Sequence, residues 1–129
     1  MAKKDNDSLW GSRFSSGPSP EMANLSKSTH FDWRLAKYDL LGSKAHAEAL
    51  AAKGYLNDGE LKELTKAIEQ LETRVSSGSF KPKETDEDVH SALERGLIEI
   101  AGADLGGKLR AGRSRNDQIA TEIRLFMLH

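Results

Sequence analysis

Apolar residues between positions 31 and 50 fall into two stripes, each recurring at intervals of three, four or seven residues. The stripes are Phe31, Leu35, Tyr38, Ala45 and Ala49, and Trp33, Ala36, Leu40, Ala47 and Leu50. Such spacing is typical of a helix. The tract from Asp32 to Lys53 is therefore predicted to be a helix buried on much of its circumference. Gly54 is well placed to end it.

A second apolar seam lies between Asn57 and Gly78. It comprises Leu61, Leu64, Ile68, Leu71 and Val75. Asn57 and Glu60 have the spacing of a capping box, which favours a helix start, and Gly78 favours a helix end. Two heptads are too few for a coiled coil. The seam predicts a helix that packs on a neighbouring helix.

The third region begins with an acidic run over residues 84–88, which suits the positive end of a helix dipole. The apolar stripe that follows is Val89, Leu93, Gly96, Leu97 and Ile100. A glycine-rich, basic segment then leads to a last predicted helix after Asn116-Asp117. Its apolar positions are Ile119, Ile123, Phe126 and Met127. Since no segment alternates convincingly as a strand would, the predicted fold class is all-α.

Three parts of the chain differ in composition. Residues 1–20 are predicted to form an extended arm, because eight of the ten residues between 11 and 20 are Gly, Ser or Pro. Residues 21–111 are predicted to form a helical domain. Residues 112–129 are predicted to be a loop and the start of a longer helix. The last apolar pattern continues to His129 without Gly or Pro, so the sequence is expected to be part of a longer chain.

Charge and cysteine content exclude several classes of function. The chain has 129 residues, with 19 Lys and Arg against 20 Asp and Glu, and a net charge of −1. This balance disfavours a general nucleic-acid or membrane-surface binder. The absence of Cys excludes disulfides, thiolate nucleophiles and Cys-ligated metals. No apolar run has the ~18–20 residues that a membrane span needs, and the start is unlike a secretory signal. A soluble, cytoplasmic protein is expected.

Two candidate sites are disfavoured by their surroundings. Residues 102–108 have the spacing of a phosphate-binding loop, but Leu109 replaces the Ser or Thr that would hold magnesium, and a helix precedes the loop. Glu87 and His90 have the Glu-x-x-His spacing of di-iron bundles, but only one such motif is present. No metal site is predicted. For His90, an ordinary surface or hydrogen-bonded core position and a functional role both remain open.

The segment over residues 112–117, Gly-Arg-Ser-Arg-Asn-Asp, is the densest polar cluster. It directly precedes a predicted helix N-terminus, where free N–H groups and the helix dipole attract anions. Arginine can also hold a carboxylate through two hydrogen bonds. A solvated basic turn or a helix cap is the alternative, and a contact to nucleic-acid phosphates is disfavoured by the neutral charge.

Several stretches together resemble the argininosuccinate lyase family of the fumarase/aspartase superfamily. Residues 9–14 are similar to its Trp-Gly-Gly-Arg-Phe opening, and residues 87–94 to its Glu-Asp-Ile-His-x-x-x-Glu helix start. Residues 108–118 resemble its Gly-Arg-Ser-Arg-Asn-Asp-Gln motif, and Ser28 and Asp32 match a Ser-x-x-x-Asp pair. Ser12 and Ala111 depart from the family pattern, where Gly and Thr are usual. The resemblance runs from about Leu9 to His129.

The resemblance implies a substrate site in an enzyme that cleaves argininosuccinate to arginine and fumarate by acid/base elimination. Ser28 and Asn116 would bind substrate. Asp88, His90, Ser114 and Arg115 would support the site. The family's general acid and base belong to a Thr-His segment and a Gly-Ser-Ser loop, neither of which this sequence contains. The isolated chain is therefore expected to hold no catalytic residue and to be inactive.

The resemblance also implies the N-terminal helical domain and the first turns of the central bundle helix of the fumarase/aspartase fold. The family's full-length enzyme is a homotetramer whose active sites each draw on three subunits. Neither a cofactor nor a metal is expected, and neither are nucleic-acid or membrane partners. The alternatives are a non-catalytic helical interaction module derived from the same fold, and a sister lyase of the superfamily.

Overall fold

The computed structural model describes residues 19–129, and every regular element in that range is a helix, as predicted. The elements are α1 (Pro20–Ser26), α2 (Thr29–Asp32), the 3-10 turn η1 (Trp33–Leu35), α3 (Ala36–Ala52), α4 (Asp58–Ser76), α5 (Val89–Ala101), α6 (Ala103–Lys108) and α7 (Arg115–Leu128). Nearly all of the predicted arm, including the resemblance at residues 9–14, lies outside the described residues. Its last residue, Pro20, begins α1.

Three of the longer helices, α4, α5 and α7, begin at short local motifs. The predicted capping box of α4 is confirmed: Asn57 Oδ1 accepts a hydrogen bond from the Glu60 N–H at 2.9 Å, and Glu60 Oε2 accepts one from the Asn57 N–H at 3.0 Å. Helices α5 and α7 begin with capping boxes of the same kind, at Asp88 and Ser114. Gly54 and Gly78 follow α3 and α4 with φ of 78° and 72°, a conformation that favours glycine.

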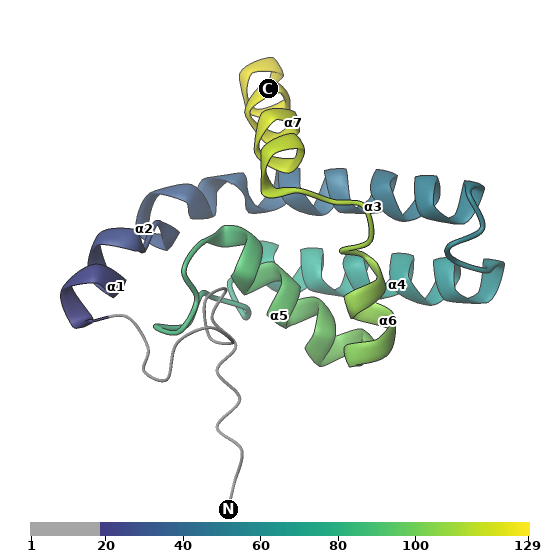
Figure 1. Cartoon of the computed structure of the whole chain (residues 1–129), viewed down its shortest axis with the longest axis horizontal. Coiled ribbons are helices and arrows are strands. Elements are labelled where there is room, and N and C mark those ends of the chain that lie inside the picture. The colour runs from purple at the N-terminus through teal and green to yellow at the C-terminus, as the bar shows by residue number, and fades with distance from the viewer. Residues whose placement is uncertain (1–18) are drawn as a thin grey trace, which may run out of the picture.

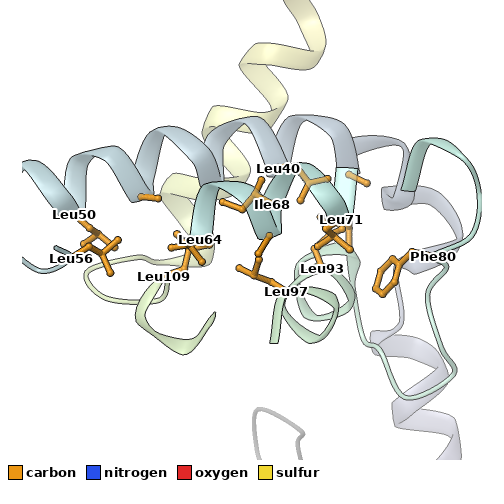
Figure 2. Packing of buried hydrophobic residues seen from close by; sticks show 14 residues of the cluster. Leu40, Leu50, Leu56, Leu64, Ile68, Leu71, Phe80, Leu93, Leu97 and Leu109 are labelled. Atoms are coloured by element: carbon orange, nitrogen blue, oxygen red, sulfur yellow. The ribbon is translucent and has the colours of Figure 1, made fainter. Parts of the chain in front are cut away.

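The hydrophobic core lies where antiparallel helices α3 and α4 meet α5 (Figure 1). Leu64, Ile68 and Leu71 of α4 are almost fully buried, and the predicted seam is confirmed because Leu61 and Val75 pack at its edges. Leu40 and Leu50 of α3 and Leu93 and Leu97 of α5 belong to the same cluster, which Figure 2 shows. Burying one such side chain contributes about 1.5–3 kcal/mol.

The prediction for residues 32–53 is partly wrong. The second stripe is mainly buried, but in the first stripe Phe31 is 54% exposed, and Ala45 and Ala49 are exposed as well. The reason is that α4 and α5 cover one side of α3 and α7 covers only its N-terminal part. Asp39 and Ser43 instead occupy buried positions on α3. The tract is also interrupted, because η1 separates α2 from α3.

Helix α6 and the turn after it return the chain to α3. The segment over residues 102–108, which has phosphate-loop spacing, forms α6 and packs on α5. The His46 ring Nε2 lies 3.0 Å from the Ala111 carbonyl oxygen and ties the following turn to α3. Helix α7 then packs across α3 and projects away from the other helices (Figure 1). Among residues 19–129, no helix combines the length and apolar character needed to cross a membrane.

Candidate functional site

Ser28 is held by hydrogen bonds beside the N-terminus of α5. The Ser28 N–H donates to the Glu87 carbonyl oxygen at 2.8 Å, and its hydroxyl donates to Asp32 Oδ2 at 2.6 Å. The same Asp32 oxygen accepts a hydrogen bond from the Val89 N–H at 3.2 Å, in the first turn of α5. The Ser-x-x-x-Asp pair therefore connects α2 to the start of α5. Asp32 Oδ1 is buried and has no hydrogen-bond partner among the described residues.

Asp88 joins the start of α5 to the start of α7. Its Oδ1 accepts a hydrogen bond from the Ser91 N–H at 2.8 Å, which caps α5. Its Oδ2 forms an ion pair with Arg115 Nη1. Arg115 is the first residue of α7. This ion pair therefore brings residues 112–118, which we call the signature loop, next to the segment that holds Ser28.

The signature loop presents the side-chain amide of Asn116 at the surface. Ser114 Oγ accepts a hydrogen bond from the Asn116 N–H at 3.0 Å, and Asp117 Oδ1 accepts one from the Ser114 N–H at 3.0 Å. The Ser114 hydroxyl therefore caps α7, one of the alternatives that the sequence left open. The Asn116 side chain is exposed. The loop offers an amide and a helix N-terminus to an incoming anion.

Six polar side chains meet where α3, α5 and α7 come together, and we call this group the polar junction. It consists of Asp39, Ser43, His90, Arg113, Gln118 and Glu122. Asp39 is at its centre and is 2% exposed. His90 Nδ1 lies 2.7 Å from Asp39 Oδ2 and 3.4 Å from Glu122 Oε1. His90 is therefore a hydrogen-bonded core residue in contact with two carboxyl groups, one of the two alternatives left open by its sequence.

The protonation states of the junction follow from its burial and charges. Burial alone would lower the pKa of His90, but the hydrogen bond and charge of Asp39, together with the charges of Glu122 and Asp32, raise it. The pKa of Glu122 is raised to about 7, mainly by burial and also by the negative charge of Asp39. His90 and Arg113 act in the opposite direction and lower this pKa. Near neutral pH, Glu122 therefore lies close to its titration point.

A cavity of about 140 Å³ opens beside the polar junction. Its apolar lining residues are Leu40, Ile68, Leu71, Leu93, Leu97 and Leu109. Junction residues and the loop residues Ser114 and Arg115 also line it. The cavity is thus continuous with the signature loop and belongs to the same site.

Three junction side chains are of the types that bind metal ions. Asp39, His90 and Glu122 each place one ligand-type atom within 4.8 Å of the others. Asp39, however, already accepts hydrogen bonds from Ser43 and Gln118 at 2.9 and 2.8 Å, and Arg113 lies 3.8 Å away. These contacts fit a hydrogen-bonded network better than a metal centre.

The structure groups the predicted residues into a surface part and a buried part. Ser28, Asp88, Ser114, Arg115 and Asn116 come from segments brought together at the starts of α5 and α7, whereas His90 points into the polar junction. Sequence reasoning missed Asp39 and Glu122. The available signal was spacing: Ala36, Leu40, Ser43, Ala47 and Leu50 are separated by 4, 3, 4 and 3 residues, so Ser43 interrupts an apolar heptad and Asp39 lies four residues before it.

The model of a protein family described as Lyase matches residues 12–129. Since this range covers most of the chain, the chain belongs to that lyase family.

Several curated relatives share the name argininosuccinate lyase. The protein of Leifsonia xyli subsp. xyli is 68% identical over 123 residues, which are 95% of this chain and 26% of that protein. The protein of Clavibacter sepedonicus is 65% identical over 119 residues, 92% of this chain and 24% of that protein. That of Thermobifida fusca is 61% identical over 119 residues, 92% of this chain and 25% of that protein. The chain spans about a quarter of the length of these relatives.

Proposed function

We propose that the chain is the N-terminal part of an argininosuccinate lyase, which cleaves argininosuccinate to arginine and fumarate. The observation that carries this proposal is that three separate segments meet at the starts of α5 and α7. Arg115 forms an ion pair with Asp88, and the neighbouring Glu87 accepts a hydrogen bond from Ser28. The substrate carries several carboxylates, and a helix N-terminus with an arginine suits such groups. The names of the relatives support the same activity.

In this proposal Ser28 and Asn116 bind the substrate. Ser114 and Arg115 line the loop, and Asp88 and His90 support it. Elimination removes a proton from the carbon next to a carboxylate, and the developing negative charge spreads into that carboxylate. Donors held in place around that charge stabilise the transition state. The base that takes the proton and the acid that protonates the departing guanidino nitrogen come from segments outside these 129 residues.

The complete enzyme would be a cytoplasmic homotetramer of arginine biosynthesis. Residues 21–111 would form its N-terminal domain, and residues 112–129 the substrate loop and first turns of a central bundle helix. Support comes from α7, whose large apolar side chains remain exposed. They are Ile119, Ile123, Phe126, Met127 and Leu128, between 38% and 78% exposed. Burying such a face against neighbouring helices is the usual way to stabilise it.

The same exposed face favours a second candidate, a non-catalytic helical interaction module. In that case α7 would bind a partner helix and the signature loop would serve only as the cap of α7. The two functions differ in what they require of Asn116, because helix capping uses its backbone and substrate binding uses its exposed amide.

A chimera tests the proposal. Residues 1–129 replace the matching N-terminal region of the Leifsonia xyli enzyme, and fumarate absorbance is followed with argininosuccinate. We expect turnover by the chimera and none by the 129-residue chain alone. Asn116→Ala should lower kcat/KM by roughly 100-fold or more, as removal of one preorganised donor does. Gln70→Ala, an exposed amide on α4, is the matched control. An inactive chimera, or an Asn116→Ala chimera as active as its parent, would contradict the proposal.

A further inference from the structure

A single buried carboxylate, that of Asp39, accepts hydrogen bonds from three helices. Its Oδ1 accepts one from the Ser43 hydroxyl of α3 at 2.9 Å. Its Oδ2 lies 2.8 Å from Gln118 Nε2 of α7 and 2.7 Å from His90 Nδ1 of α5. A buried charge needs such partners to be tolerated, so these three donors are fixed around Asp39.

The same carboxylate controls both ends of the signature loop. Gln118 lies at the end of the loop, and Arg113 lies near its start. Arg113 Nη2 is 3.8 Å from Asp39 Oδ1, while its Nη1 donates to the Ser43 hydroxyl at 2.8 Å. The exposed Asn116 lies between these two anchors. Its position relative to α3 and α5 therefore depends on a carboxylate that does not itself reach the surface.

Asp39 also determines that the Nδ1 atom of the His90 ring carries a hydrogen. Because Nδ1 faces the carboxylate, Nδ1 carries the hydrogen and donates it to Asp39, which fixes the orientation of the ring. The other charged groups that act on His90 are Glu122 of α7 and Asp32 of α2. Glu122 is 1% exposed, and neither of its carboxyl oxygens has a hydrogen-bond partner among the described residues. Asp39 is thus the main hydrogen-bond partner of His90 in the junction.

We propose that Asp39 is a positioning residue of the lyase reaction, which sets the signature loop and the His90 ring relative to the substrate. It acts through Gln118, Arg113 and His90 and touches no substrate itself. The inference rests on the proposed function. It assigns to the buried side of the site a task that the exposed residues cannot perform, since none of them joins α3 to α7.

Asp39→Asn in the chimera is the principal test. Asparagine has the same shape but carries no charge, so it cannot accept all of these hydrogen bonds as a carboxylate does. A displaced loop misplaces substrate, for which losses of about 10- to 100-fold are typical. We expect KM to rise and kcat to fall, with kcat/KM lower by that factor. Partial unfolding gives a different result, because it reduces the amount of active enzyme and leaves KM unchanged.

A second readout follows the His90 ring directly. In an NMR titration of the 129-residue chain, Asp39→Asn should lower the pKa of His90, because the main partner of its charged form is lost. Leu64→Ala is the matched control for stability: Leu64 is fully buried in α4 and lines neither the cavity nor the junction. It should weaken folding while leaving the KM of the chimera and the His90 titration unchanged.

Gln118→Met provides the decisive variant if Asp39→Asn does not fold. It removes only the link between α7 and Asp39 and keeps a side chain of similar length, so KM should again rise. An unchanged KM in a folded variant, with the parent chimera active, overturns the positioning role alone. A parent chimera without turnover overturns the proposed function and the positioning role together. An equal rise of KM in Leu64→Ala would assign the effect to general destabilisation and also overturn the positioning role.

Discussion

Helix α3 makes two contacts of opposite chemistry. Along α4 it forms an apolar seam, in which Leu40 and Leu50 face Leu64 and Ile68. Where α7 crosses it, α3 presents Asp39, which is as well buried as those side chains and makes hydrogen bonds instead of apolar contacts. One helix therefore uses non-directional packing on one face and directional bonding on another.

The difference matters because the two kinds of contact specify different things. Hydrophobic burial is non-directional and scales with the area removed from water, so the seam stabilises the α3–α4 pair and tolerates small shifts. A buried polar network is satisfied only at particular distances and angles. The polar junction therefore adds less stability than the seam and defines the orientation of α7 more strictly.

The largest expected effect is in the seam. Leu64→Ala should lower the free energy of unfolding by about 3–5 kcal/mol, because a fully buried leucine leaves a cavity that its neighbours fill only in part. Urea denaturation of the 129-residue chain measures it. The control is Leu41→Ala on the same helix pair, where the side chain is 52% exposed. Similar losses for both variants would contradict the assignment of the seam as the stabilising contact.

Glu122→Gln should have the next largest effect, and only at higher pH. The pKa of Glu122 is raised from 4.5 to about 7. A raised carboxyl pKa stabilises the fold below pH 4.5, and this contribution is lost as the pH rises toward 7. At about 1.4 kcal/mol per pH unit, the loss is about 3–4 kcal/mol.

Glutamine mimics the neutral carboxyl group and does not ionise. The variant and the parent should thus be similarly stable at pH 4.5, and the variant should be more stable at pH 8. Urea denaturation at both pH values measures the difference. Glu63→Gln, at an exposed position on α4, provides the baseline for a carboxyl in water. If the parent and Glu122→Gln lose stability in parallel as the pH rises, Glu122 does not titrate in this range.

The seam could be predicted from sequence and the junction could not. The seam is visible in the sequence because apolar side chains at helical spacing are usually buried on one side of a helix. Its residues are Leu61, Leu64, Ile68, Leu71 and Val75. The capping residues are equally local, since Asn57 and Glu60 satisfy each other within one turn. Such features depend on near neighbours in the chain and are visible in a single sequence.

Asp39 and Glu122 belong to a different case. Each is polar, and polar residues are ordinarily exposed. Their burial depends on donors far away in the sequence, since Gln118 follows Asp39 by 79 residues and His90 follows it by 51. Spacing alone also gave too much weight to Ala45 and Ala49, because α4 and α5 cover only one side of α3. The motif resemblance selected the surface residues of the candidate site and the buried His90, whereas Asp39 and Glu122 became visible only in the fold.

A smaller effect is expected where α5 meets the core. A Cβ added at Gly96 would lie 2.6 Å from Phe80 Cζ and 2.8 Å from Leu71 Cδ1. Gly96→Ala should therefore cost about 1–3 kcal/mol through overpacking, measured by thermal denaturation. Gly107→Ala in α6 is the matched control. Apart from its chain neighbours and the backbone of its own helix, no atom lies within 4 Å of the added Cβ, so alanine should stabilise that helix slightly. If both variants were stabilised, the tight approach at Gly96 would not hold.

The smallest effect is expected for Lys44→Met, at an exposed ion pair whose length nearly equals that of the buried contact between His90 and Asp39. Lys44 Nζ lies 2.6 Å from Glu69 Oε1 across the exposed rim of the seam, and His90 Nδ1 lies 2.7 Å from Asp39 Oδ2 inside the junction. Water and salt screen the first pair and hardly reach the second.

Lys44→Met keeps most of the side-chain stem and removes the charge, so the urea midpoint should stay unchanged and show no added dependence on salt. His90→Gln, which removes the imidazole that contacts Asp39 inside the junction, should lower the midpoint at every salt concentration. If Lys44→Met lowered the midpoint as much as His90→Gln, distance rather than burial would govern the contribution of these contacts.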